Sequence, residues 1–455
     1  MRATEPLTGL RETPPGGVPS VAVLVELVRS PDAGGHMKCW ERFAEAAADL
    51  DAAALGMDLT LYVLGSEERV DRLSPAVRFV SLRPVVSTAP LMRVSGGADV
   101  TDLVPYHPRL ARLLPAHDVW HLTHVFGFAT TAVRLARQGR RRVGSRLRAG
   151  TPAGRLVGSV HTDVPALAAA YLHALTGPLT VPGTMAAQLI RHRRDRLLRA
   201  CDRVLVATPE QRRDIAAAVP PHRVGLLDRG VDHDRFGPDP AARSRFHRRH
   251  GIPEDRPTVL FSGRVDSSKR VMVLADALHR LNSDGVRSHL VVAGSGPEEG
   301  DLRRLLGPDV TLLGPVPQPV LAQVYAGCDI FAFPSRSETI GNAVGEAMAC
   351  HLPVVLPAGA RTTRWLSRPG ADGVVVRRDD AAGWSAALRP LLREPELRRT
   401  LGGSAGRTAR EQHRTWRQVL TEDLLPVWRS AAARKAPDAP GGAAVPPGGG
   451  DTHAC

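Results

Sequence analysis

Short apolar runs alternate with amphipathic stretches along most of the chain. In the first half, the runs that predict strands fall at 21–28, 59–64, 78–82, 118–122, 156–161 and 203–207. Between them the spacing of apolar residues is helical, as in the segment from Met37 to Leu55. Strands that alternate with helices in this way indicate a parallel, doubly wound sheet.

The alternation lapses over 228–257, a stretch that predicts a linker with a short helix, and then resumes. The second set of strand-like runs falls at 259–262, 290–293, 310–313, 330–333, 354–356 and 374–376. The chain of 455 residues is too long for one ordinary core, so the sequence predicts two Rossmann-like halves. A helical run from Trp384 to about Arg429 could lie along both.

This pattern gives a division of the chain. The predicted parts are a disordered tail at 1–19, an N-terminal domain at 20–230, a linker at 231–256, a C-terminal domain at 257–408, a helix at 409–432 that packs back on the N-terminal domain, and a second disordered tail at 433–455.

Polar and glycine-rich segments recur where the predicted strands end. They are Gly34-Gly35, His161 to Asp163, Gly263-Arg264, Gly294 to Gly296, and Ser335 to Glu338. Ligands of doubly wound sheets bind outside the carboxyl ends of the strands. Two sheets whose carboxyl ends face one another would therefore enclose a ligand-binding cleft.

The segment from Pro334 to Val355 carries the most informative chemistry. It reads as the end of a buried strand, a loop containing Glu338, a helix from Asn342 that contains Glu346, and the next strand. A helix start presents free N–H groups and partial positive charge, which favour phosphate. Carboxylates beside a phosphate site indicate a second task, such as binding sugar or ribose hydroxyls.

Two cations leave an earlier strand end close together in sequence. Arg264 can bind a phosphate with two hydrogen bonds, and Lys269 adds a mobile point charge. Together with a helix start they could neutralise a diphosphate without a metal ion. The alternative for this fragment alone is a solvated charged turn.

Two other strand ends are ambiguous when taken alone. Gly34-Gly35 would let the backbone approach a ligand closely, or would simply form a turn. His161 could reach into the cleft or be a core residue that hydrogen-bonds to backbone. The spacing of His36, His121 and His124 matches no zinc signature, which favours structural or substrate contacts.

Among the features of the composition, only the net charge suggests a binding partner. Hydrophobic residues at 43% and charged residues at 23% are ordinary for a globular protein, whereas the formal net charge is +14. The basic runs 137–148 and 191–199 could meet an anionic membrane surface, or could be solvated faces that reflect a coding bias towards Arg. No aromatic residues are interleaved with them, which argues against specific nucleic-acid binding.

The cysteines, the first residues and the lengths of the apolar runs indicate where the protein is located, and the cysteines fit a reducing compartment. The five cysteines form no CxxC pair, and the first residues lack the apolar core of a signal peptide. No apolar run approaches the roughly 20 residues that span a bilayer. We therefore expect a cytoplasmic protein, with any membrane contact peripheral and at the inner face.

The motifs together resemble a known family. Gly263-Arg264-x4-Lys269, Glu338-x7-Glu346-Ala-Met-Ala and Pro353-Val-Val are similar to landmarks of glycosyltransferase family 4, retaining enzymes of GT-B fold. The likeness runs over about 20–400 in consistent order, and Glu-x7-Glu is its most specific element. It implies an α/β fold with two Rossmann-like domains facing across a cleft, and a nucleotide-diphospho-sugar as co-substrate, with no other cofactor and no metal.

The resemblance also implies residue roles. Arg264 and Lys269 would bind the donor diphosphate, helped by Gly34, Gly35 and the backbone near Ile340, Gly341 and Asn342. Glu338 would hold donor-sugar hydroxyls and Glu346 the ribose. His161 would lie near the transferred sugar, with His36 and Asp163 on the acceptor side.

Three places depart from the family pattern. His351 replaces a common glycine and would have to adopt a left-handed conformation, Ile340 replaces an aromatic residue, and the segment Gly359 to Arg364 lacks the acid of the usual Gly-Gly-x-x-Glu pattern. The implied function is transfer of a hexosyl-type group to an unidentified hydroxyl acceptor on a glycan, lipid or small molecule. The alternatives are a GT-B sugar-nucleotide epimerase or phosphorylase, and a catalytically weakened basic binding protein of the same fold.

Overall fold

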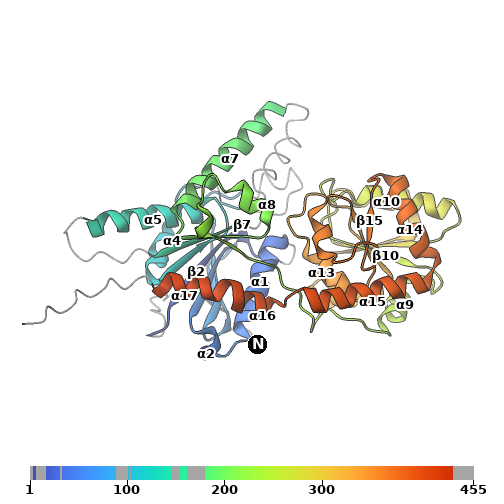
Figure 1. Ribbon diagram of the computed structural model, residues 1–455, viewed down its shortest axis with the longest axis horizontal. Helices are drawn as coiled ribbons and strands as arrows, with labels where there is room; N and C mark the ends of the chain where they lie inside the picture. Colours follow the sequence, from blue (N-terminus) through green and yellow to red (C-terminus); the bar gives the residue numbers. More distant parts are fainter. Residues whose placement is uncertain are drawn as a thin grey trace, which may run out of the picture.

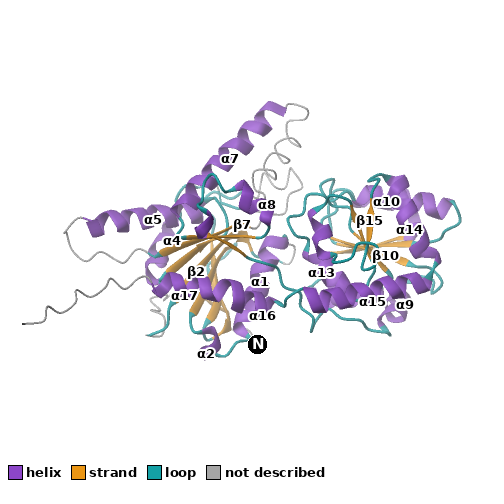
Figure 2. Ribbon diagram, in the orientation of Figure 1, coloured by secondary structure: helices purple, strands orange, loops and turns teal. Residues whose placement is uncertain are grey.

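Two separate sheets carry the apolar runs of the chain, and helices cover both faces of each sheet (Figures 1 and 2). The computed structural model describes residues 4–6, 17–30, 33–88, 101–102, 104–144, 154–160 and 180–433. The predicted two-domain α/β architecture is confirmed. Each domain buries its own apolar side chains, because each sheet is hydrophobic on both faces and needs helices on both.

The first sheet contains every strand predicted for this half of the chain. Its parallel members are β2 (Ser20–Val28), β3 (Asp58–Leu64), β5 (Val77–Leu82), β6 (Val119–Leu122), β7 (Arg155–Val160), β8 (Arg203–Val206) and β9 (Val224–Leu226). The strand order across the sheet is β1-β4-β5-β3-β2-β6-β7-β8-β9. The short strand β9 was not predicted, and neither was the polar strand β4 (Arg69–Ser74), which lies antiparallel to β5.

The prediction of disorder over 1–19 is wrong for one segment. Strand β1 (Thr4–Pro6) pairs antiparallel with β4, with Glu5 opposite Val70. The cause is the edge of the sheet, because β4 offers unpaired backbone groups that a polar segment can satisfy. The tail predicted at 433–455 lies outside the described residues except for Ala433, which ends the last helix.

The helix predicted from Met37 to Leu55 is two helices. Helix α1 spans Gly35–Ala48 and helix α2 spans Ala52–Leu55. The Asp51 carboxylate starts the second helix by accepting a hydrogen bond from the Ala54 N–H at 2.8 Å. Capping by Asp competes with a continuous helix and explains the break. The other long helices of this domain are α5 (Gly127–Gly144) and α7 (Thr180–Ala200).

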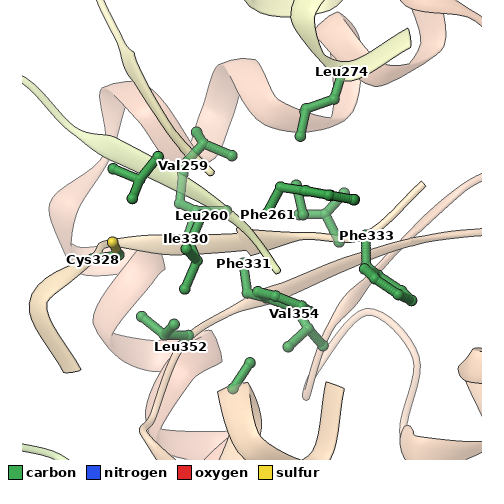
Figure 3. Close-up of a cluster of buried hydrophobic side chains, with 14 of the residues drawn as sticks. Val259, Leu260, Phe261, Leu274, Cys328, Ile330, Phe331, Phe333, Leu352 and Val354 are labelled. Carbon is green, nitrogen blue, oxygen red and sulfur yellow. The ribbon is translucent and has the colours of Figure 1, made fainter. Parts of the chain in front are cut away.

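The second sheet is entirely parallel and contains the six predicted strands. The order is β12-β11-β10-β13-β14-β15, formed by β10 (Thr258–Ser262), β11 (His289–Ala293), β12 (Val310–Gly314), β13 (Ile330–Ala332), β14 (Val354–Pro357) and β15 (Val374–Val376). Figure 3 shows its central core, where Phe261 comes from β10, Phe331 from β13 and Phe333 from the position directly after β13. The rings of Phe331 and Phe333 stack with centroids 5.7 Å apart.

Helices α10 (Val271–Ser283), α11 (Glu299–Leu306), α12 (Gln318–Gly327), α13 (Asn342–Ala349) and α14 (Ala381–Arg393) surround this sheet. Helix α13 ends at Ala349, and His351, two residues later, has a φ of 61°, which confirms the left-handed conformation expected there. A Cβ on Gly406 of helix α15 (Pro395–Gln412) would lie only 2.1 Å from the His351 ring, so this glycine makes room for the imidazole.

The chain crosses between the domains twice. The first crossing leads through Val231 to α9 (Ala242–His250), whose Phe246 lies in the core of the second domain. The second follows α15 and returns through Thr415 to α16 (Trp416–Val419) and α17 (Leu425–Ala433), which pack in the core of the first domain. The two crossings touch, because the Val231 N–H donates to the Arg414 carbonyl at 3.0 Å.

Among the described residues, no helix combines the length and the apolar character needed to cross a membrane.

Candidate functional site

The turn that follows β10 presents the two predicted cations. Gly263, whose φ is 152°, lets the chain leave the strand. The turn after it is hydrogen-bonded to the loop after β11, because the Val265 N–H donates to the Ser295 carbonyl at 2.9 Å. A Cβ on Gly294 would lie 1.9 Å from the Gly263 oxygen, and one on Gly296 would lie 2.2 Å from the Val265 oxygen. These two glycines therefore allow the close contact that fixes the turn carrying Arg264.

Asp266 organises the cationic turn. Its carboxylate lies 3.4 Å from Nε of Arg264 and accepts a hydrogen bond from the Lys269 N–H at 3.2 Å. Ser268 also donates its hydroxyl to this carboxylate. Both cationic side chains are held at the carboxyl end of β10, as the strand-end argument predicts, and Arg264 retains 23% exposure.

Lys269 forms an ion pair with Glu338. The ammonium of Lys269 contacts Oε1 of Glu338, and the two side chains are only 13% and 24% exposed. A second link joins the same two loops, because the Ser337 hydroxyl donates to the Ser268 carbonyl at 3.1 Å. The structure thus brings together two residues 69 positions apart that were predicted to serve one site.

The loop of Glu338 leads directly into helix α13. Gly341 precedes the helix with a φ of 74°, and no side chain caps the helix start. A Cβ on Gly341 would lie 2.6 Å from Cγ2 of Thr362, so both the conformation and the space require glycine. The Ile340 carbonyl is fixed by the Trp365 indole N–H at 2.8 Å. The helix start at Asn342, with its partial positive charge, therefore lies next to the Lys269–Glu338 pair.

Glu346 lies on the second turn of α13 and is half-buried. Burial raises its pKa to about 7, against the opposing effect of Arg42 on α1 of the first domain and of the nearby Tyr325 hydroxyl. The Tyr325 hydroxyl is buried and lies close enough to the Glu346 carboxyl group to favour its charged form. Glu346 is therefore a carboxyl group whose charge changes near neutral pH, in a place that both domains influence.

The glycines of the first domain lie at the start of helix α1. Gly34 is its N-cap residue and Gly35 its first residue. A Cβ on Gly35 would meet no atom within 4 Å, so local packing does not require a glycine there. In Figure 1, α1 lies on the side of its domain that faces α13 of the other domain.

His36 joins a small polar cluster behind these glycines. Its Nε2 lies 3.2 Å from the Thr123 hydroxyl, and its ring lies 4.1 Å from that of His124. Burial, followed by the nearby His124, holds the pKa of His36 well below its usual value, and burial lowers that of His124 to about 4. Both rings are therefore neutral at pH 7. His161 and Asp163 lie outside the described residues, directly beyond the end of β7.

Several residues that shape the site were not predicted. Arg42 and Tyr325 act on Glu346 from distant parts of the chain, and no local pattern marks them. Asp266 lies between the two predicted cations, and its position in sequence could have identified it. No group of three or more His, Cys, Asp and Glu side chains among the described residues is placed to hold a metal ion.

Comparison with known proteins identifies the family to which this fold belongs. The family model described as glycosyl transferases group 1 matches residues 256–394. A D-inositol 3-phosphate glycosyltransferase of Thermomonospora curvata is 30% identical over 383 residues, which cover 79% of this chain and 83% of the relative. One of the same name from Thermobispora bispora is 34% identical over 231 residues, 47% of this chain and 53% of that relative.

Solved structures give the same fold. A sucrose-phosphate synthase from Thermosynechococcus elongatus superimposes with a TM-score of 0.65 at 19% identity, over 91% of this chain and all (100%) of that one. The Anabaena HepE protein in complex with UDP and glucose gives 0.64 at 14% identity, over 90% and 99%. These solved structures confirm the GT-B fold expected from the sequence. The relative from Thermomonospora curvata, which is matched over most of its length, shows the family of the chain. The chain belongs to the group 1 glycosyl transferases and is a glycosyltransferase of GT-B fold.

Proposed function

We propose that this glycosyltransferase moves a hexosyl-type group from a nucleotide-diphospho-sugar to a hydroxyl acceptor, with retention of anomeric configuration and without a bound metal ion. The observation that carries the proposal is the Lys269–Glu338 ion pair beside the uncapped start of α13. A cation, a carboxylate and a helix start in one place suit a ligand that has both a phosphate and hydroxyl groups.

In this proposal the diphosphate binds to Arg264, Lys269 and the N–H groups at Ile340, Gly341 and Asn342. Lys269 then exchanges its contact with Glu338 for one with phosphate. This exchange frees the Glu338 carboxylate to accept hydrogen bonds from the donor sugar, and Glu346 receives the ribose hydroxyls. Gly34 and Gly35 approach the diphosphate from the first domain, where packing leaves space at Gly35.

The chemistry follows from charge. The bond between the anomeric carbon and the leaving phosphate oxygen breaks while the acceptor oxygen bonds to the same face of the sugar. The acceptor proton passes to the leaving phosphate. The leaving diphosphate gains negative charge, which Arg264, Lys269 and the helix start are already oriented to stabilise. This arrangement supplies the cationic charge that a metal ion would otherwise provide.

The acceptor side is proposed to lie in the first domain, with His161 near the transferred sugar and His36 and Asp163 close to the acceptor. The relatives support a first acceptor to test, because two of them are named for D-inositol 3-phosphate. HepE was solved with UDP and glucose, which supports a uridine nucleotide as the first donor to test.

A thermal-shift screen with UDP, GDP, ADP and their sugars tests the donor proposal. A nucleotide at a hundred times its dissociation constant should stabilise the protein by about 2.7 kcal/mol. Lys269→Ala should weaken nucleoside-diphosphate binding, whereas Lys38→Ala on α1, whose ammonium lies 3.0 Å from Glu41, is a matched control. No stabilisation by any nucleotide, with salt-dependent binding to anionic polymers instead, would favour the binding-protein alternative.

Product analysis tests the chemistry. The anomeric configuration of the product should equal that of the donor, and turnover should survive EDTA. Turnover that EDTA abolishes and magnesium or manganese restores would contradict the metal-free proposal, and an inverted product would contradict retention.

We also propose peripheral contact with an anionic membrane through helix α7. Met185 and Leu189 on this helix are 64% and 70% exposed, and the neighbouring Arg191 and Arg196 are exposed as well. Exposed apolar and basic side chains on one helix suit a lipid surface with negative charge. Sedimentation with phosphatidylserine vesicles, compared with phosphatidylcholine vesicles, tests this, and equal recovery with both would contradict it.

A further inference from the structure

The carboxylate of Asp379 joins three segments of the second domain. Asp379 lies between β15 and α14, and its side chain is only 12% exposed. Its Oδ2 accepts hydrogen bonds from the guanidinium groups of Arg270 and, at 3.1 Å, Arg336. Its Oδ1 accepts one from the indole of Trp384 at 2.9 Å. The Asp379 carbonyl oxygen also accepts from Arg270, at 3.0 Å.

The two arginines flank the ion pair of the proposed donor site. Arg270 follows Lys269 directly, and Arg336 precedes Glu338 by two positions. The two loops are therefore joined at the Lys269–Glu338 pair and again where both arginines bind one carboxylate. A third link, from the Ser337 hydroxyl to the Ser268 carbonyl, is a single hydrogen bond between neutral groups. Of the two links between charged groups, only the one through Asp379 involves no group that is proposed to bind the donor.

The backbone at Arg270 needs this support. Its φ is 58°, a left-handed conformation that residues other than glycine rarely adopt. Arg270 is also the residue from which helix α10 starts, and no side chain caps that start. Two hydrogen bonds to Asp379 hold the Arg270 side chain, so they favour the conformation that directs Lys269 towards Glu338.

Asp379 is suited to a permanent structural bond. Burial raises the pKa of its carboxyl group, but hydrogen bonds from Trp384, Arg270 and Arg336 outweigh burial and lower the pKa overall. The group is therefore ionised at neutral pH. The buried Trp384, with no exposed surface, fixes the orientation of the carboxylate.

We propose that Asp379 is a positioning residue of the donor site, which sets the relative placement of Lys269 and Glu338 through Arg270 and Arg336. The inference rests on the proposed function, because it assigns the two positioned residues to the donor. Asp379 matters most when the donor is bound. Lys269 then leaves Glu338 for the diphosphate, and the bonds through Asp379 remain, beside the Ser337–Ser268 hydrogen bond, to hold the two loops together.

The test compares Asp379→Asn with Asp380→Asn in the full chain. Asp380 is the adjacent carboxylate, and its side chain caps α14 through the Gly383 N–H at 2.8 Å without touching either loop. We measure UDP affinity by calorimetry, KM for the donor, KM for the acceptor, and the unfolding temperature. Asp379→Asn should raise the donor KM roughly tenfold, because hydrogen bonds between charged groups are among the strongest in proteins. The acceptor KM should not change, and Asp380→Asn should leave both constants unchanged.

A second variant keeps the inference testable if Asp379→Asn does not fold. Arg336→Met removes the hydrogen bond from Arg336 to Asp379, and the fold should tolerate it because this side chain is 52% exposed. It should raise the donor KM by a smaller factor than Asp379→Asn does. A lower unfolding temperature with unchanged donor KM and UDP affinity would overturn the inference, because Asp379 would then be structural only. Equal increases in donor and acceptor KM would overturn it as well. A wild-type protein that binds no nucleotide would instead refute the proposed function.

Discussion

The indole N–H of Trp428 donates a hydrogen bond of 2.9 Å to Nδ1 of His121, across 307 positions of the sequence. Both side chains have no exposed surface, and their rings meet edge to face with centroids 5.7 Å apart. Burial lowers the pKa of His121 to about 3, so the ring is neutral and can accept this bond. The contact ties the last helix, α17, to strand β6 of the first domain.

Trp428→Phe should lower the free energy of unfolding of the first domain by about 1–3 kcal/mol, because it leaves a buried acceptor on His121 without its donor. Trp428→Ala should cost roughly 3–5 kcal/mol, because it also leaves a cavity. Urea unfolding followed by intrinsic fluorescence and circular dichroism measures both. A matched control is Ser430→Ala, which truncates an exposed side chain on the same helix. Equal stability of Trp428→Phe and wild type would show that the bond contributes nothing.

This relationship also marks the limit of what the sequence could predict. The alternation of apolar runs predicted the parallel strands of both sheets except β9, because strands buried on two faces are continuously apolar. It predicted neither β4 nor β1, since edge strands with one solvated face are polar and are held by backbone pairing. The return of the chain to the first domain was expected, but its anchor, Trp428 on His121, depends on a partner far away in sequence.

The candidate site divides in the same way. Glu338, Glu346, Arg264 and Lys269 were predicted, because their motifs are local and their residue types match the chemistry of phosphates and hydroxyls. The direct contact between Lys269 and Glu338 and the role of Asp379 were not, because they depend on how separate loops pack. His161 and Asp163 lie outside the described residues, so their assignment stays a prediction.

The pKa of Glu346, raised to about 7 by burial, predicts a pH dependence of stability. The unfolded state loses this proton near 4.5, whereas the folded state keeps it up to about 7. The folded state therefore binds more protons in this window, and the contribution of Glu346 to stability falls as pH rises through it. Glu346→Gln removes the penalty, so the unfolding temperature of the variant minus that of wild type should become more positive from pH 4.5 to pH 8.

Differential scanning fluorimetry over this range measures the difference, with Glu411→Gln, which changes an exposed carboxylate on α15, as a control. A difference that does not change with pH would mean that the carboxyl group of Glu346 does not titrate in this window. If Glu346 binds ribose hydroxyls as a carboxylate, UDP affinity of the wild type should increase across pH 7. The glutamine variant should lack this step.

The Lys269–Glu338 ion pair predicts opposite effects of its two partners on nucleotide binding. Glu338→Gln removes the negative charge that competes with phosphate for Lys269, so UDP affinity should stay equal to wild type or increase a few-fold. Turnover should still fall by more than about tenfold, because the hydrogen bonds to the sugar weaken. Lys269→Ala should weaken UDP binding and leave Glu338 without its partner. Calorimetry with UDP and steady-state kinetics separate these effects. Loss of UDP affinity in Glu338→Gln would contradict the exchange of Lys269 between carboxylate and phosphate.

Arg364 and Glu210 form an ion pair between the two domains, so we expect the charge at position 364 to affect donor binding between them. The guanidinium on the turn after β14 lies 3.9 Å from the carboxylate at the start of helix α8 (Pro209–Asp214), and the side chains are 47% and 45% exposed. Arg364 also ends the segment Gly359 to Arg364, which lacks the acid that the sequence resemblance leads one to expect there. Arg364→Glu would place two carboxylates opposite each other.

The expected effect of Arg364→Glu is a donor KM higher by a few-fold, because exposed ion pairs contribute at most about 1 kcal/mol. The exchanged pair Arg364→Glu with Glu210→Arg should restore the wild-type value, and about 0.5 M NaCl should remove most of the difference, because salt screens exposed charges. Arg361→Glu, on the same turn, controls for the change in net charge. The same effect of Arg361→Glu and Arg364→Glu on the donor KM would contradict this prediction, and so would a donor KM of the exchanged pair that stays above the wild-type value. Either result would mean that net charge, and not the contact with Glu210, determines the donor KM.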